Sequence, residues 1–96
     1  MAHPPTFYRN PDIVYRQIDG GGVLLNIKSG AYHEINSTAR EIWEALETPS
    51  TESEVLERLV VRFGDVDDLG SDISEFIRRL EERDLIFSDT DSTDHL

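Results

Sequence analysis

Four side chains in the last third of the chain have the types and spacing needed to bind a peptide. On a helix, Asp72, Phe76, Arg79 and Arg83 fall within about 60° of one another, beside an apolar stripe. Arginine stems cover apolar surface, and guanidinium groups bond carboxylates or carbonyl oxygens. The pattern indicates a possible groove wall. It is also typical of an ordinary amphipathic helix, with Phe76 in the core, Asp72 as a cap and the arginines paired with glutamates.

Residues 31–35, AYHEI, form a second candidate binding element. As a strand, they place Ala31, His33 and Ile35 on one face, and Tyr32 and Glu34 on the other. A half-exposed strand tyrosine most often packs on its own sheet. With its apolar ring and polar tip it is also a good peptide contact.

The remaining residues offer no constellation for catalysis or metal binding. The chain has no cysteine, which excludes a thiolate metal site and a cysteine nucleophile. His3 and His95 lie near the chain ends, far from His33, whereas a catalytic or metal site needs histidines that converge with carboxylates. Residues 20–22, GGG, occupy a hairpin turn with no helix after it, so they are not a phosphate loop. We expect a binding protein that is not an enzyme and uses no metal or cofactor.

The charge of the chain excludes further classes of function. The formal net charge is -11, from 20 acidic and 9 basic residues. Affinity for nucleic acid comes largely from lysine and arginine contacts to phosphates, so we expect no nucleic-acid binding. No run of 18 apolar residues is present, and the N-terminus does not resemble a signal peptide. We expect a cytoplasmic protein without membrane contact.

Strand signals come first along the chain. Residues 13–18 (IVYRQI) and 23–28 (VLLNIK) read as strands around a glycine turn, and a second turn at residues 29–30 leads into residues 31–35. In the second strand the odd positions form an apolar face and the even positions point the other way: Val23, Leu25 and Ile27 against Leu24, Asn26 and Lys28. The pattern predicts a three-stranded antiparallel meander.

Helical spacing follows from Asn36 onward. Asn36 or Ser37 caps a first helix that Pro49 ends, and residues 51–54 (TESE) form a capping box for a second helix that ends at Gly64. A third helix begins near Ser71 or Asp72, and residues 85–87 add a short final strand. The fold class is therefore α+β, with three strands followed by three helices (β-β-β-α-α-α) in a winged-helix-like arrangement. We expect a flexible arm at residues 1–12, the domain at 13–87 and a disordered acidic tail at 88–96.

The ordered combination of these residues resembles the PqqD-like proteins, which are RiPP recognition elements. The resemblance covers residues ~13–87 on this reading of the elements. It is carried by Leu24-Leu25 before a glycine turn, Tyr32-x-x-Ile35-Asn36-x-Thr38-Ala39, Arg62-Phe63, Asp72-x-x-x-Phe76-x-x-x-Leu80, and Leu85. The Gly-x-Tyr and Asp-x-x-x-Phe portions look most like the stand-alone recognition proteins of lasso-peptide pathways.

This resemblance implies a concrete function. The leader of a ribosomally made precursor, often of the Tyr-x-x-Pro type, would add as a strand to the third strand, beside the last helix. The implied partner is a separate leader peptidase, to which this chain would supply proximity. The implied peptide-binding residues are Ala31, Tyr32, His33, Glu34, Ile35, Asp72, Phe76, Arg79, Leu80 and Arg83.

Two other functions stay open from the residues alone. A winged-helix architecture suggests a DNA-binding protein, although the exposed side of the last helix mixes acids and arginines where a DNA-reading helix has a basic stripe. The chain could also be a general protein-interaction adaptor that uses the same helix against a folded partner.

Overall fold

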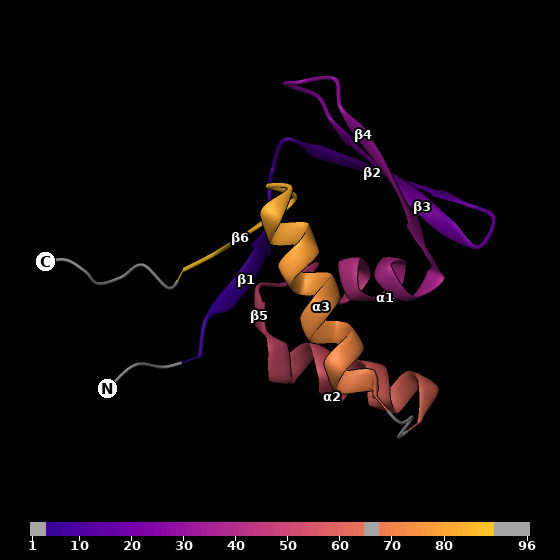
Figure 1. The fold of residues 1–96 in the computed structure, drawn as a ribbon, viewed down its shortest axis with the longest axis vertical. Coiled ribbons are helices and arrows are strands. Elements are labelled where there is room, and N and C mark those ends of the chain that lie inside the picture. Colours follow the sequence, from indigo (N-terminus) through magenta and orange to yellow (C-terminus); the bar gives the residue numbers. More distant parts are fainter. Residues whose placement is uncertain (1–3, 65–67, 90–96) are drawn as a thin grey trace, which may run out of the picture.

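The computed structural model describes residues 4–64 and 68–89, which form two small antiparallel sheets and three helices (Figure 1). The α+β class and the three helices are confirmed, but the expected topology is wrong. The described residues contain six strands, and two of them follow the first helix. In chain order the elements are β1 (Thr6–Arg9), β2 (Ile13–Ile18), β3 (Gly21–Asn26), β4 (Tyr32–Asn36), α1 (Ser37–Ala45), β5 (Ser50–Thr51), α2 (Glu52–Phe63), α3 (Leu69–Glu82) and β6 (Ile86–Ser88).

The first sheet is the expected meander, in the order β2-β3-β4. Its first turn is shorter than predicted, because Gly21 and Gly22 belong to β3. A side chain at Gly21 would collide with the carbonyl oxygen of Ile35, and one at Gly22 would collide with the ring of Tyr15. These glycines therefore serve close packing between strands, which turn signals in the sequence do not distinguish from a hairpin loop.

The apolar face expected from Val23, Leu25 and Ile27 is not the one that packs on the core. Leu24 is fully buried, whereas Leu25 is 38% and Ile27 60% exposed. Leu24 pairs with Tyr15 and His33 across the sheet, and α1 packs against β3 and β4. Gly22, on the same face as Leu24, leaves the space that the Tyr15 ring fills. Ile13, Tyr15 and Ile35 also pack against the core from this face.

The second sheet has the order β5-β1-β6, and of its strands only β6 was expected, as a short strand at residues 85–87. Within the segment expected to be an arm, Thr6–Arg9 forms β1, which pairs with Ser50–Thr51 on one side and Ile86–Ser88 on the other. Phe7 is buried, and Tyr8 contacts Phe87 edge to face with ring centroids 5.8 Å apart. The rest of the expected arm before residue 4 and of the expected tail from residue 90 lies outside the described residues.

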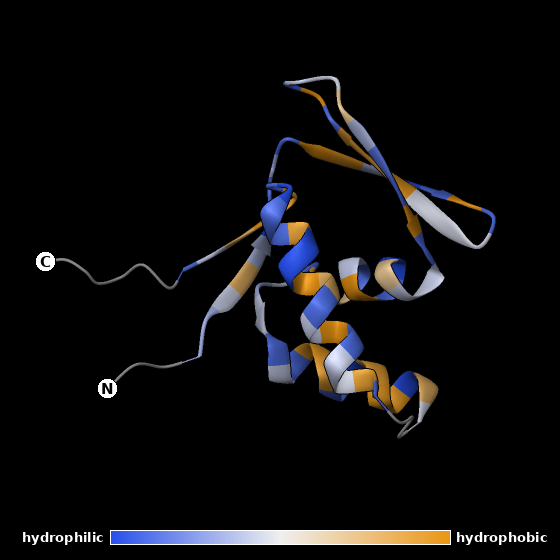
Figure 2. Ribbon diagram, in the orientation of Figure 1, coloured by the Kyte–Doolittle hydropathy of each residue, from blue (hydrophilic) through white to orange (hydrophobic). Residues whose placement is uncertain are grey.

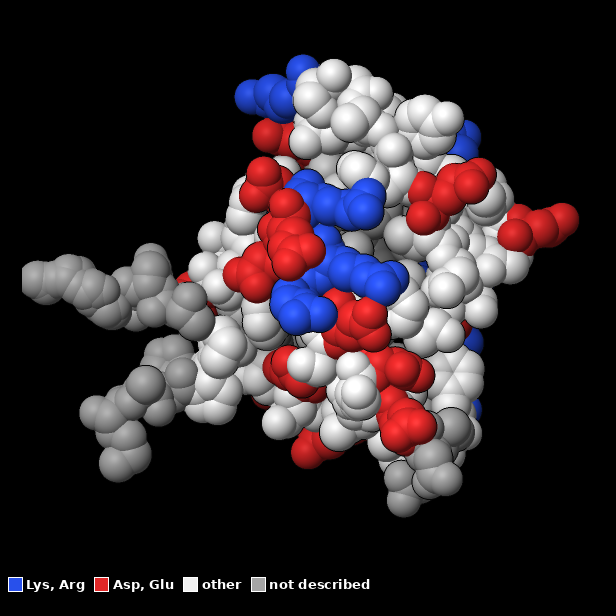
Figure 3. All heavy atoms as spheres, in the orientation of Figure 1, with Lys and Arg blue, Asp and Glu red and all other residues white. Residues whose placement is uncertain are grey.

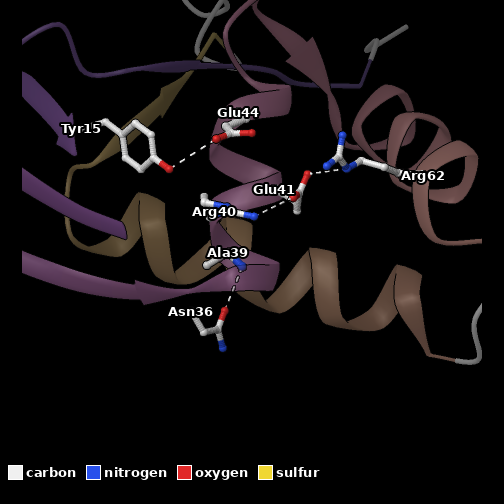
Figure 4. Close-up of polar contacts among 7 residues, drawn as sticks. All are labelled: Tyr15, Asn36, Ala39, Arg40, Glu41, Glu44 and Arg62. Atoms are coloured by element: carbon white, nitrogen blue, oxygen red, sulfur yellow. Dashed lines mark hydrogen bonds and ion pairs between the residues drawn. The ribbon is translucent and has the colours of Figure 1, made fainter. Parts of the chain in front are cut away.

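The first two helices begin as their capping residues predict. Asn36 accepts a hydrogen bond from the Ala39 amide (2.9 Å; Figure 4), and Thr51 and Glu54 form a reciprocal capping box at the start of α2. Gly64 ends α2 with a positive φ of 84°. α3 begins at Leu69, earlier than the expected Ser71 or Asp72, because Asp68 adopts a left-handed conformation (φ 67°) that turns the chain into the helix.

One hydrophobic core joins all three helices to the two sheets. Apolar and polar positions alternate along the helices (Figure 2), and the buried side chains come from every layer. Arg9 ties β1 to this core, because it stacks over the Trp43 ring (4.8 Å) and donates to the Trp43 carbonyl oxygen (3.1 and 2.6 Å). The buried carboxylate of Glu41 links α1 to α2 through Arg62 (2.9 Å; Figure 4). Among the described residues, no helix is long and apolar enough to cross a membrane.

Candidate functional site

A groove runs between β4 and α3. It encloses a cavity of about 250 Å³ at the open edge of the first sheet, because β4 is the last strand in the order β2-β3-β4 and α3 lies beside it (Figure 1). The lining combines an apolar floor with a polar mouth. Its residues are His33, Glu34, Ile35, Asn36, Ala39, Phe76, Arg79, Leu80, Arg83 and Leu85.

The backbone of β4 presents hydrogen-bonding groups at this edge. The amide of Asn26 donates to the carbonyl oxygen of Ala31 (2.8 Å), which sets the phase of the β3–β4 ladder. Because antiparallel pairs alternate between bonded and non-bonded, His33 and Ile35 direct their backbone groups toward β3. Tyr32 and Glu34 direct theirs outward, where no strand of the described residues pairs with them. The edge is therefore open to an added strand.

α3 supplies the second wall through residues at the border of its buried stripe. Ile73, Ile77 and Leu80 are buried in the core, while Phe76 is only partly buried and reaches the cavity. Arg79 pairs with Glu75 one turn earlier (2.7 Å). The wall is therefore apolar in its middle and basic at its rim.

The mouth of the groove carries a contact between its two walls. The Arg83 guanidinium Nη1 lies 3.3 Å from Nδ1 of His33. Basic side chains gather over the C-terminal half of α3, next to a hollow in the surface and with acidic side chains around them (Figure 3). In a chain of net charge -11, this local group of arginines is a marked departure from the general surface charge.

Seven of the ten residues expected to bind a peptide line this one cavity. They are His33, Glu34, Ile35, Phe76, Arg79, Leu80 and Arg83. The other three do not line it. Ala31 precedes β4, Tyr32 is 67% exposed on the opposite face of the sheet, and Asp72 lies one turn before Phe76.

Three lining residues were not among those expected. Asn36 and Ala39 belong to the junction of β4 and α1, and Leu85 begins the return to β6. Helical spacing does place Ala39 on the buried face of α1, and it lines the cavity together with Ile35 and Phe76. Leu85 carries no local signal, because it reaches the groove only through the turn after α3.

The ionisable groups with shifted pKa values lie away from the groove. Burial lowers the pKa of Arg9. Burial, and after it the neighbouring Glu44 carboxylate, raises the pKa of the Tyr15 phenol, whose hydroxyl donates to Glu44 (3.3 Å; Figure 4). Both side chains connect strands to α1, so their pKa shifts result from the packing of these elements. The described residues contain no group of three histidine or acidic side chains placed to hold a metal ion.

Comparisons with known proteins give one family and two similar structures. A model of the family described as coenzyme PQQ synthesis protein D (PqqD) matches residues 21–86. The fold is similar to TbiB1 in complex with the TbiA(beta) leader peptide, at 22% identity and a TM-score of 0.71 over 82% of this chain and 93% of that one. It is also similar to a lasso peptide synthetase B1 complexed with the leader peptide, at 29% identity and a TM-score of 0.70 over 84% and 96%. No curated protein sequence matches the chain.

Proposed function

The chain belongs to the PqqD family, and we propose that it is a non-catalytic recognition protein that binds the leader segment of a ribosomally made lasso-type precursor peptide. The proposal is supported by the B1 protein that is 29% identical and was solved with a leader peptide. The observation that carries it is that the unpaired edge of β4 lies beside a groove lined by apolar and basic side chains. An extended peptide needs both features, since main-chain hydrogen bonds provide affinity and pockets for alternate side chains provide specificity.

The leader joins β4 as a further strand of the first sheet. Tyr32 and Glu34 offer the outward backbone groups, and every second leader side chain points into the cavity. The cavity of about 250 Å³ is smaller than the roughly 300–1,000 Å³ of small-molecule sites. It suits single side chains, and the tyrosine or proline of a Tyr-x-x-Pro leader fits its floor of Ile35, Phe76 and Leu80.

The bound leader is then presented to a separate leader peptidase. Holding a substrate beside a catalyst makes their encounter effectively intramolecular, so a binding protein accelerates cleavage without catalysing it. We place this step in the cytoplasm, where a ribosomally made precursor first appears.

The proposal is tested with a synthetic Tyr-x-x-Pro leader peptide in isothermal titration calorimetry against the full chain. We expect saturable one-to-one binding, and no binding of a scrambled peptide of the same composition. Methylating the leader backbone nitrogens at alternate positions separates strand addition from other modes. One set of alternate methyl groups should abolish binding, because only one set of amides faces β4. Equal affinity for both methylated sets, or for the scrambled peptide, would refute strand addition.

A further inference from the structure

We propose that the groove selects a leader with a carboxylate side chain at the position that faces Arg83 and His33, two residues away from the leader's apolar anchor. The inference rests on the proposed function and deepens it by naming a specificity-determining pair and the side chain that it recognises.

The chemistry of the Arg83–His33 contact favours a ligand group that accepts hydrogen bonds. Arginine remains protonated and only donates hydrogen bonds, so Nδ1 of His33, 3.3 Å from Arg83 Nη1, is the acceptor and the imidazole proton lies on Nε2. The remaining polar groups of the pair are then all donors: the other guanidinium N–H groups and the imidazole Nε2–H. A carboxylate satisfies such a set, and charge-assisted hydrogen bonds to it are stronger than neutral ones.

Arg83 is also the groove arginine whose charge is not neutralised. Arg79 is paired with Glu75 (2.7 Å), whereas Arg83 makes no ion pair with any acidic side chain of residues 4–64 and 68–89. Glu34 lines the same cavity, but it alternates with His33 along β4 and forms no ion pair with Arg83. With 20 acidic residues available in the chain, a guanidinium without a carboxylate at the mouth of a groove fits a site whose carboxylate comes from the ligand.

The spacing follows from the period of a strand. His33 and Ile35 lie on the same face of β4, two residues apart, and both line the cavity. His33 meets the Arg83 end of α3, and Ile35 lies at the apolar floor with Phe76 and Leu80. A strand added to β4 has the same period of two. A leader side chain at the floor therefore has its neighbour two residues away at the Arg83–His33 pair.

The general charge of the protein makes this preference specific to one position. A net charge of -11 repels acidic peptides at long range. An added carboxylate should therefore weaken binding at most leader positions and strengthen it only beside Arg83. A general electrostatic effect would not depend on position in this way.

The test uses Tyr-x-x-Pro peptides in which a single glutamate, glutamine or lysine is moved through each position. Their affinities are measured by calorimetry against the wild-type protein, Arg83→Gln and Arg78→Gln. Arg78 is the matched control, because it is an exposed arginine of α3 outside the groove lining. We expect glutamate to bind roughly threefold to tenfold more tightly than glutamine at one position, since the pair is partly exposed to solvent. That position should lie two residues from the one most sensitive to alanine.

The variants decide the assignment. The glutamate preference should vanish in Arg83→Gln and persist in Arg78→Gln. It should survive in part in Arg83→Lys, because lysine keeps the positive charge but lacks the planar pair of N–H donors of the guanidinium group. Equal binding of glutamate and glutamine peptides at every position would overturn the inference and leave the proposed function intact. A preference that persists in Arg83→Gln would also overturn it. Failure of every peptide to bind the wild-type protein would refute both proposals.

Discussion

Phe76 has the largest apolar side chain in the groove. It is partly buried, in contrast to the buried Ile73 and Ile77 on the same helix, so part of its ring packs on the core and part faces the cavity. Aromatic residues in such positions dominate binding energies at interfaces, because they bury a large area with few rotatable bonds. At the residue scale, Phe76 is therefore the principal apolar contact that we assign to the leader.

Replacing Phe76 with alanine should weaken leader binding by at least about tenfold, equivalent to about 1.4 kcal/mol. The matched control is Phe63→Ala, because Phe63 is exposed at the end of α2 and lies outside the groove lining. Calorimetry measures the affinities, and circular dichroism checks that both variants are folded. Equal losses in the two variants would mean that Phe76 makes no special contact.

Helical spacing in the sequence predicted that Phe76, Arg79 and Arg83 lie together, because the first two are on α3 and Arg83 caps its C-terminal end. It could not separate Asp72 from them, since position along the helix axis matters as well as angle. It also could not show which strand residues face α3. That depends on which face of the sheet α1 covers, a tertiary feature that local pattern does not encode.

At the scale of elements, packing decides which face of the first sheet lies against the core, more than the number of apolar residues on each face does. Its inner face contains Leu24 beside the space left by Gly22, and its outer face contains more aliphatic residues that remain exposed. The phase of β3 in turn fixes that of β4, because the two strands are paired residue by residue. Leu24 thus determines that His33 and Ile35, and not Tyr32, face the groove.

Leu24→Ala should lower the free energy of unfolding by about 2–5 kcal/mol, since it leaves a cavity at a fully buried position. Leu25→Ala should lower it by less than about 1 kcal/mol, because its side chain is 38% exposed. Urea unfolding of the two variants compares neighbours of identical chemistry. The reverse order would mean that the strand presents its other face to the core.

Elements with strong local signals could be predicted from the sequence. The bounds of β2 are those expected, and the caps at Asn36, Thr51 and Gly64 begin or end helices as predicted. The pairing of β1, β5 and β6 into one sheet could not be predicted from the sequence, because these strands are short and pair with segments distant in the chain. Phe7 and Ile86 are buried only once that second sheet has formed.

At the scale of the whole molecule, a chain that is acidic overall carries a group of arginines beside the groove. The net charge is -11, and the arginines of α3 border the groove (Figure 3). The expected resemblance to PqqD-like proteins is confirmed by the family match over residues 21–86. Fold alone would leave a DNA-binding function open, so charge is the property that separates the two functions.

We expect no binding to duplex DNA even at low ionic strength, where phosphate contacts are strongest. An electrophoretic mobility-shift assay with random-sequence duplex measures this directly. A basic DNA-binding protein in the same gel is the positive control for the assay. Retardation of DNA by the wild-type chain would support the winged-helix DNA-binding alternative.

The most direct test of leader recognition is backbone amide NMR of the isotope-labelled chain during titration with an unlabelled Tyr-x-x-Pro leader. We expect chemical-shift changes concentrated in Tyr32–Asn36 of β4 and in residues 76–83, at the C-terminal end of α3 and its cap. We also expect slowed hydrogen exchange at the amides of Tyr32 and Glu34, which acquire leader carbonyl partners, with little change at His33 and Ile35. Shifts confined to the α1–α2 surface, with β4 exchange unchanged at saturation, would contradict leader binding at this edge.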